Sequence, residues 1–186
     1  METSKTLQSE HNAVLYVLDE LKLAAGAAAD GQAVPAAVFT DIEEFFRVFV
    51  DRCHHGKEES VLFPRLAGTG LPNQLEGEHG EGRRLAQAYA RAVAYYRPGD
   101  RARGAAVERA AADYAAMLRA HIAKENAELL SAIDRELSGE DAEIVEAFER
   151  IETDRIGAGT HERLHGTIET LAGRIAPFLP AAVASR

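Results

Sequence analysis

Apolar residues recur with a helical period along the chain, and strict two-residue alternation is nearly absent. In the first segment, positions on one helical face follow each other at spacings of four and three: Leu7, His11, Val14, Leu18 and Leu21. Because His11 interrupts an otherwise apolar stripe, it should point inward. We expect this helix to end before a loop at residues 26–34.

Three further long helices follow in the pattern. The second begins at Pro35, which suits the first turn of a helix, and should stop near Pro64. The third follows the turn at residues 68–72, and the fourth is capped by Asp100 and continues through Leu129. Long helices joined by short loops predict an all-α protein, an antiparallel up-down-up-down four-helix bundle.

One or two additional helices are expected beyond the bundle. Residues 138–141 read as a capping box that opens a shorter helix, and residues 157–160 break that helix and cap a last one. The tail after Pro177 should fray. We therefore expect a bundle at residues 1–137 and a helical extension at residues 138–186 that packs on the same domain.

Composition and charge exclude several classes of protein. The 186 residues are 46% apolar and 27% charged, as in one ordinary globular domain. A net charge of −9 argues against nucleic acid and anionic membranes as partners. The single cysteine, Cys53, cannot form an internal disulfide, and no apolar stretch approaches a signal peptide or a membrane span. These features predict a cytoplasmic protein; they leave its oligomeric state open.

An internal repeat carries the candidate chemistry. Residues 54–63 align with residues 121–130, and each matched residue lies 67 positions after its counterpart. The matched pairs are His54 with His121, Lys57 with Lys124, Glu58 with Glu125 and Leu62 with Leu129. In each copy the histidine and the glutamate stand four apart, so both project from one helix face and can bind one ion.

One such motif would usually mark a solvated helix face, but two copies on separate helices change the interpretation. His11 and His79 add one inward histidine from each of the other two helices. Imidazole and carboxylate donors without a thiolate cluster suit iron or manganese better than structural zinc. Two carboxylates at one depth could bridge a pair of ions, so we expect a dinuclear non-haem centre.

Together these motifs resemble the hemerythrin-like, or HHE cation-binding, family. The resembling stretches are Glu10-His11-Asn12, residues 53–59 with Leu62-Phe63-Pro64, residues 78–83 and residues 121–125. The resemblance implies two Fe ions in an oxo- or hydroxo-bridged centre inside a four-helix bundle. It implies His11, His54, His79 and His121 as terminal ligands, with Glu58 and Glu125 as bridging carboxylates.

The function implied by the resemblance is the binding of dioxygen or a related small ligand, such as nitric oxide or peroxide. Its roles would be sensing, iron and oxygen handling, or stress defence. The alternative is an enzyme of the same centre that consumes peroxide or nitric oxide, which would need an acid or base beside the open iron. The candidates for that group are Glu59, Glu81 and a tyrosine. A third possibility is an interaction module that uses iron to stay folded.

The chain departs from oxygen-carrying hemerythrins near His79. Those proteins place two histidines one turn apart on the third helix, whereas Leu75 and Arg83 flank His79 here. Some hemerythrin-like domains use the residue after the first motif histidine, which makes His55 a candidate ligand. Neighbouring helical residues differ by roughly 100° in direction, so His55 could instead lie at the core edge or face solvent. Glu76 is a weaker substitute.

Two other motifs compete with this interpretation. His161-Glu162-Arg163-Leu164-His165 matches the HExxH pattern of zinc hydrolases, with Glu162 as general base, but no edge strand is predicted to hold a peptide. The remote alternative is therefore a zinc hydrolase. Glu-x-x-His strings at residues 76–79 and 162–165 suggest ferritin-like di-iron proteins, but they would leave three inward histidines without a role. We expect His161 and His165 to pack over the bundle.

Residues close to the motifs have simpler interpretations. Cys53 reads as a small core residue and not as a redox thiol. Lys57 and Lys124 alternate with the candidate ligands, and we expect them to lie away from the metals.

Overall fold

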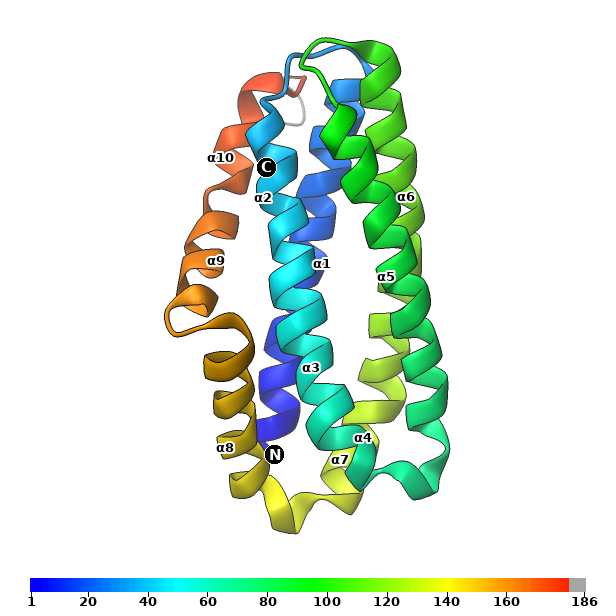
Figure 1. Ribbon diagram of the computed structural model, residues 1–186, viewed down its shortest axis with the longest axis vertical. Helices are drawn as coiled ribbons and strands as arrows, with labels where there is room; N and C mark the ends of the chain where they lie inside the picture. The colour runs from blue at the N-terminus through cyan, green and yellow to red at the C-terminus, as the bar shows by residue number, and fades with distance from the viewer. Residues whose placement is uncertain (181–186) are drawn as a thin grey trace.

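The computed structural model describes residues 1–180, and every regular element in this part of the chain is helical. The long helices lie side by side along the longest dimension of the molecule (Figure 1). None of the described helices is both long enough and apolar enough to cross a membrane. The α-helices are α1 (Glu2–Ala29), α2 (Ala36–Glu44), α3 (His55–Lys57), α4 (Phe63–Arg65), α5 (Leu71–Tyr95), α6 (Arg101–Lys124), α7 (Leu130–Glu136), α8 (Asp141–Ile151), α9 (Thr160–Glu169) and α10 (Leu171–Ile175).

Wider π-helical turns join several of these helices into longer rods. The π-helical segments are η1 (Phe45–His54), η2 (Glu58–Leu62), η4 (Glu125–Leu129) and η6 (Glu152–Ile156), and the 3₁₀ segments are η3 (Ala67–Thr69), η5 (Ser138–Glu140) and η7 (Ala176–Phe178). The second predicted helix is thus one rod from residue 36 to 65, and the fourth is one rod from 101 to 136. Segments η2 and η4 begin at Glu58 and Glu125, so the sequence repeat is also a repeat in backbone geometry, of a kind common at functional sites.

The apolar core is divided into two clusters along the rods. The larger includes Leu18, Phe46, Tyr89 and Tyr114, and the smaller contains Leu7, Leu62, Phe63, Leu75, Leu129 and Ile133. On three of the four rods the candidate ligands fall between the residues of the larger cluster and those of the smaller one; on the fourth, Glu125 does so and His121 directly precedes Ile122 of the larger cluster. The ligand layer is therefore enclosed by hydrocarbon along the rods in both directions.

The first helix is longer than predicted. The expected loop at residues 26–34 begins only at Asp30, because α1 continues through Gly26 to Ala29. Alanine favours helix, and Ala27 and Ala28 of this stretch are buried in a helix that packs on α6. The contact leaves no room for a side chain at Gly104 of α6, since a Cβ there would lie 2.1 Å from the carbonyl oxygen of Ala28.

Helix starts follow the predictions in part. The Asp100 carboxylate accepts hydrogen bonds from the Ala102 and Arg103 backbone amides, which confirms it as the cap of α6. The capping box at Ser138 is wrong, because residues 138–140 form the 3₁₀ segment η5 and α8 has no side-chain cap. The carboxylate of Asp141 caps α1 instead, accepting from the backbone amides of Glu2 and Thr3 at 2.9 and 3.0 Å.

Segments α8, η6, α9 and α10 form a C-terminal layer along one side of the rods, at the left in Figure 1. The layer packs mainly against two rods, α1 and the rod of residues 36–65. The predicted last helix begins at Thr160, as expected, but is broken at Thr170 into α9 and α10. Of the tail predicted to fray after Pro177, residues 181–186 lie outside the described residues.

Candidate metal centre

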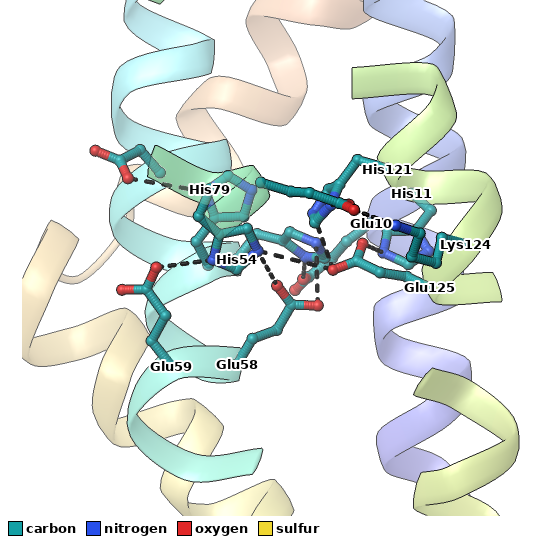
Figure 2. Close-up of polar contacts among 12 residues, drawn as sticks. Glu10, His11, His54, Glu58, Glu59, His79, His121, Lys124 and Glu125 are labelled. Carbon is teal, nitrogen blue, oxygen red and sulfur yellow. Dashed lines mark hydrogen bonds and ion pairs between the residues drawn. The ribbon is translucent and has the colours of Figure 1, made fainter. Parts of the chain in front are cut away.

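All seven predicted ligands come together between the helical rods, and Figure 2 labels all of them except His55. They form two groups that share a carboxylate, and within each group the ligand atoms lie within 4.8 Å of one another. The two-histidine subsite consists of His11, His54, Glu58 and Glu125, and the three-histidine subsite consists of His55, Glu58, His79 and His121. Each of the seven side chains belongs to a residue that is at most 3% exposed. His55 therefore lies with the other candidates and does not face solvent.

The two glutamates lie between the subsites. Glu58 has Oε1 3.6 Å from His54 Nε2 and Oε2 3.3 Å from His79 Nε2. Glu125 has Oε2 3.2 Å from His11 Nε2 and Oε1 2.9 Å from His121 Nε2. Each carboxylate thus presents one oxygen to each subsite, which is the arrangement that bridging a pair of ions requires.

The inner atoms of this cluster lack hydrogen-bond partners among the described residues. The nine atoms are His11 Nε2, both ring nitrogens of His55, His79 Nε2, His121 Nε2 and both carboxylate oxygens of Glu58 and of Glu125. A buried polar atom without a partner costs about 1–3 kcal/mol, so nine together would oppose folding strongly. Metal ions in the centre would satisfy eight of them at once, one nitrogen on each of the four histidines and both oxygens of each glutamate, and the second His55 nitrogen, Nδ1, lies toward Asp51.

Two of the imidazoles are held by parallel chains of polar contacts. His54 Nδ1 donates to Glu10 Oε2 at 2.7 Å, and Glu10 also accepts from the Lys57 ammonium. In the second copy of the repeat, His121 Nδ1 donates to Glu78 Oε2 at 2.9 Å, and Glu78 accepts from the Lys124 ammonium. Bonding at Nδ1 leaves Nε2 directed to the centre, as is usual for a ligating histidine.

The histidines of the other two helices are held by the residues that directly follow Glu58 and Glu125. His11 Nδ1 donates to Asn126 Oδ1 at 2.7 Å, and His79 Nδ1 donates to Glu59 Oε1 at the same distance. His55 differs, because its ring is stacked on His79 at 3.8 Å and the Asp51 carboxylate lies 3.8 Å from its Nδ1, too far for a hydrogen bond.

The pKa of His55 is shifted in the opposite direction from that of His79. Burial alone would lower the pKa of His79, but the nearby carboxylates of Glu125, Glu58 and Glu59 raise it to about 11. For His55, burial is the largest effect and lowers the pKa to about 3. The neighbouring His79 and His54 lower this pKa further, and Asp51 only partly opposes them. His55 is therefore neutral at pH 7, in the form that can bind a metal.

A cavity of about 230 Å³ reaches His55. Its walls include Asp51 and Arg83, joined by a 2.6 Å ion pair, and the aromatic rings of Phe46 and Tyr114. The three-histidine subsite is thus the side of the centre that borders open space among the described residues.

The lysines between the ligands do more than the sequence predicted. Lys57 and Lys124 form no hydrogen bond or ion pair with any of the seven candidates, yet each is bonded to a glutamate that holds a candidate ligand. Burial would lower the pKa of Lys57, but Glu10 raises it well above its ordinary value. Sequence reasoning also assigned no role to Glu10, Glu78 and Asn126. The available signal was position, since each directly precedes or follows a predicted ligand.

The competing motifs fall outside the centre. Glu76 is exposed, which removes it as a substitute ligand, and the Glu81 carboxylate pairs with Arg84 at the surface. His161 and His165 lie on α9 in the C-terminal layer, and Glu162 is exposed. The Glu-x-x-His strings therefore do not converge on one site. Cys53 is fully buried, as predicted for a core residue.

Comparison with known proteins supports the resemblance noted in the sequence. The family model of the hemerythrin HHE cation binding domain matches residues 3–133, so the chain belongs to this family. The matched region contains all seven candidate ligands and ends before α8. No curated protein and no solved structure matches the chain.

Proposed function

We propose that this protein is a non-haem di-iron protein that binds dioxygen or a related small ligand, such as nitric oxide or peroxide. The observation that carries the proposal is the set of nine unpaired buried atoms, which all belong to the predicted imidazoles and carboxylates. Family membership supports cation binding by the same residues.

The proposed ligands divide unequally between the ions. His11 and His54 would hold one ion, and His55, His79 and His121 would hold the other, with Glu58 and Glu125 shared. The two-histidine subsite has one protein donor fewer and is thus the better candidate for a free coordination position. When bound, the iron pair would supply redox-active positions that exchange electrons with a small ligand.

The surrounding residues orient the imidazoles and exclude water. Glu10, Glu78, Asn126 and Glu59 fix the ring orientations of four histidines through Nδ1. The two apolar clusters above and below the ligand layer exclude water, which would slow loss of the reduced state.

Binding is favoured over catalysis by the state of the nearby acids. Among the described residues, Glu10, Glu59 and Glu78 each accept a hydrogen bond from a ligand imidazole and another from a cationic side chain. A general acid or base must be available to the reacting ligand, and these carboxylates are already engaged.

The helix arrangement we propose for this function is an up-down-up-down four-helix bundle. It is supported by the packing of α1 on α6 and of α5 on α6, and by short connections at alternate ends of the rods (Figure 1). We place the bundle at residues 1–137 and treat the helices from residue 138 onward as an extension of the same domain.

The test is to express the protein with iron, measure metal per chain, and record absorption spectra before and after air. We expect about two irons and a spectrum that changes in air. Glu58→Ala should sharply lower the iron content, whereas Glu162→Ala, at an exposed site outside the centre, should not. A single zinc with cleavage of casein would contradict the proposal, and steady peroxide consumption by the iron-loaded protein would favour the enzyme.

A further inference from the structure

A second cluster of metal-binding residue types lies outside the proposed iron centre. Glu10 of α1, Glu152 of η6 and His161 of α9 each offer one ligand atom, and these atoms lie within 4.8 Å of one another. A cavity of about 290 Å³ adjoins them, and His165 also lines it. The cluster thus sits where the C-terminal layer crosses α1, with space for an ion and its water.

The two histidines of the HExxH motif face this cavity together. They are four residues apart on α9, and their ring centroids are 4.9 Å apart. Both rings pack against Phe49, at 5.4 and 6.2 Å, which limits their orientations. Within the described residues neither ring takes part in a hydrogen bond or ion pair, so their nitrogens are available.

The carboxylates leave negative charge at the cavity. Glu10 and Glu152 share one cation, the Lys57 ammonium, whose Nζ lies 2.6 Å from Glu152 Oε1. Glu2 and Lys5 also line the cavity and pair with each other at 3.6 Å, so the two carboxylates and the one ammonium leave a net charge of about −1. A carboxylate has about four lone-pair sites, so an additional cation can be accepted without displacing the lysine.

We propose that Glu152, His161, His165 and Glu10 bind a single divalent transition-metal ion, separate from the iron pair. Mixed imidazole and carboxylate donors suit Zn²⁺ or Fe²⁺, whereas Ca²⁺ and Mg²⁺ prefer oxygen alone. The HExxH motif would then contribute its two histidines without its glutamate, because Glu162 is exposed and does not line the cavity. This is a binding site and not the hydrolytic centre that the motif suggests.

The experiment is a Zn²⁺ titration of metal-free protein in competition with a chromophoric chelator. The wild-type chain should bind one equivalent more than the double variant His161→Gln/His165→Gln. Because the comparison is a difference, it holds whether or not the central site takes two ions. Glu162→Gln, in the same motif, is the matched control and should bind as wild type does.

A second variant tests the proposal even if the double variant fails to fold. Glu152→Gln keeps both rings and should weaken the additional equivalent by at least about tenfold, while circular dichroism confirms that the protein is folded. Equal stoichiometry in wild type and double variant would overturn the proposal. So would an equal loss in Glu162→Gln, because that result would show a general effect on α9.

Discussion

The first copy of the His-x-x-Lys-Glu motif, at residues 54–58, is enclosed, whereas the second copy, at residues 121–125, reaches the surface. Lys57 is completely buried, while the Lys124 side chain is 25% exposed. The C-terminal layer accounts for the difference, because Glu152 bonds to the Lys57 ammonium and the Phe148 ring lies 5.4 Å from it. Identical motifs thus acquire different surroundings from a segment outside the repeat.

Two further differences lie within the repeat. His55 of the first copy corresponds to Ile122 of the second, and Glu59 corresponds to Asn126. Ile122 joins the larger apolar cluster, whereas His55 joins the three-histidine subsite. A symmetric pair of carboxylates, each facing both subsites, is therefore combined with unequal subsites, and only a few positions create the inequality.

The largest expected effect concerns the two lysines. Lys57→Met removes a buried cation and leaves Glu10 and Glu152 without it, so we expect a loss of about 3–5 kcal/mol in the free energy of unfolding. Lys124→Met should cost less than about 1 kcal/mol, because its ion pair with Glu78 is partly solvated. Urea unfolding monitored by circular dichroism measures both values. Equal losses would show that the C-terminal layer does not distinguish the copies.

The next effect concerns the extra imidazole. His55→Ile copies the second repeat into the first and removes one proposed ligand, so metal affinity of the three-histidine subsite should fall by about 100-fold or more. Iron per chain should fall from two toward one after dialysis against a chelator, with the helical content retained. Ile122→Val, at the matched position, should keep both ions. Retention of two irons in the His55 variant would remove it from the ligand set.

The sequence alone predicted the helical class and indicated which histidines and glutamates come together, because both depend on local periodicity. Residues four apart on a helix must share a face, so His54 with Glu58 and His121 with Glu125 could be placed together from spacing alone. The position of His55 could not be decided in this way. Its direction depends on the wider π-helical turns of η1 and η2, which the three-and-four spacing rule does not describe.

Contacts between segments distant in the chain were the least predictable. Nothing local indicates that Lys57 meets Glu152, since 95 residues separate them. The local pattern likewise placed Asp141 in a capping box for its own helix, whereas its carboxylate caps α1, which is distant in the chain. Local patterns indicate which side chains need a partner, whereas the partner itself depends on tertiary packing.

A smaller effect should follow from the partners of Nδ1. Glu59→Gln keeps an acceptor for His79 but removes its charge, so the affinity of the three-histidine subsite should fall by about tenfold. Asn126→Asp makes the opposite change beside His11 and should strengthen the two-histidine subsite. Competition with a metal chelator measures both constants. If both variants changed metal affinity in the same direction, the charge of these two partners would not explain a difference in affinity between the subsites.

The smallest effect tests how the C-terminal layer is attached to α1. Hydrogen bonds from Thr3 and Glu2 hold the pKa of Asp141 down at about 2, below its ordinary value of 3.8. Its stabilising contribution is therefore complete above about pH 4 and is lost as the pH falls toward 2.

Asp141→Ala should cost about 1 kcal/mol at pH 6, as for other helix caps, and the difference from wild type should shrink between pH 4 and pH 3. Urea unfolding at each pH measures it, and Asp154→Ala, at an exposed position of η6, should show no such dependence. Acid also releases metal, but it should do so equally in wild type and variant, so the difference between their free energies of unfolding reports on Asp141. If that difference does not change with pH, Asp141 does not attach the layer through its charge.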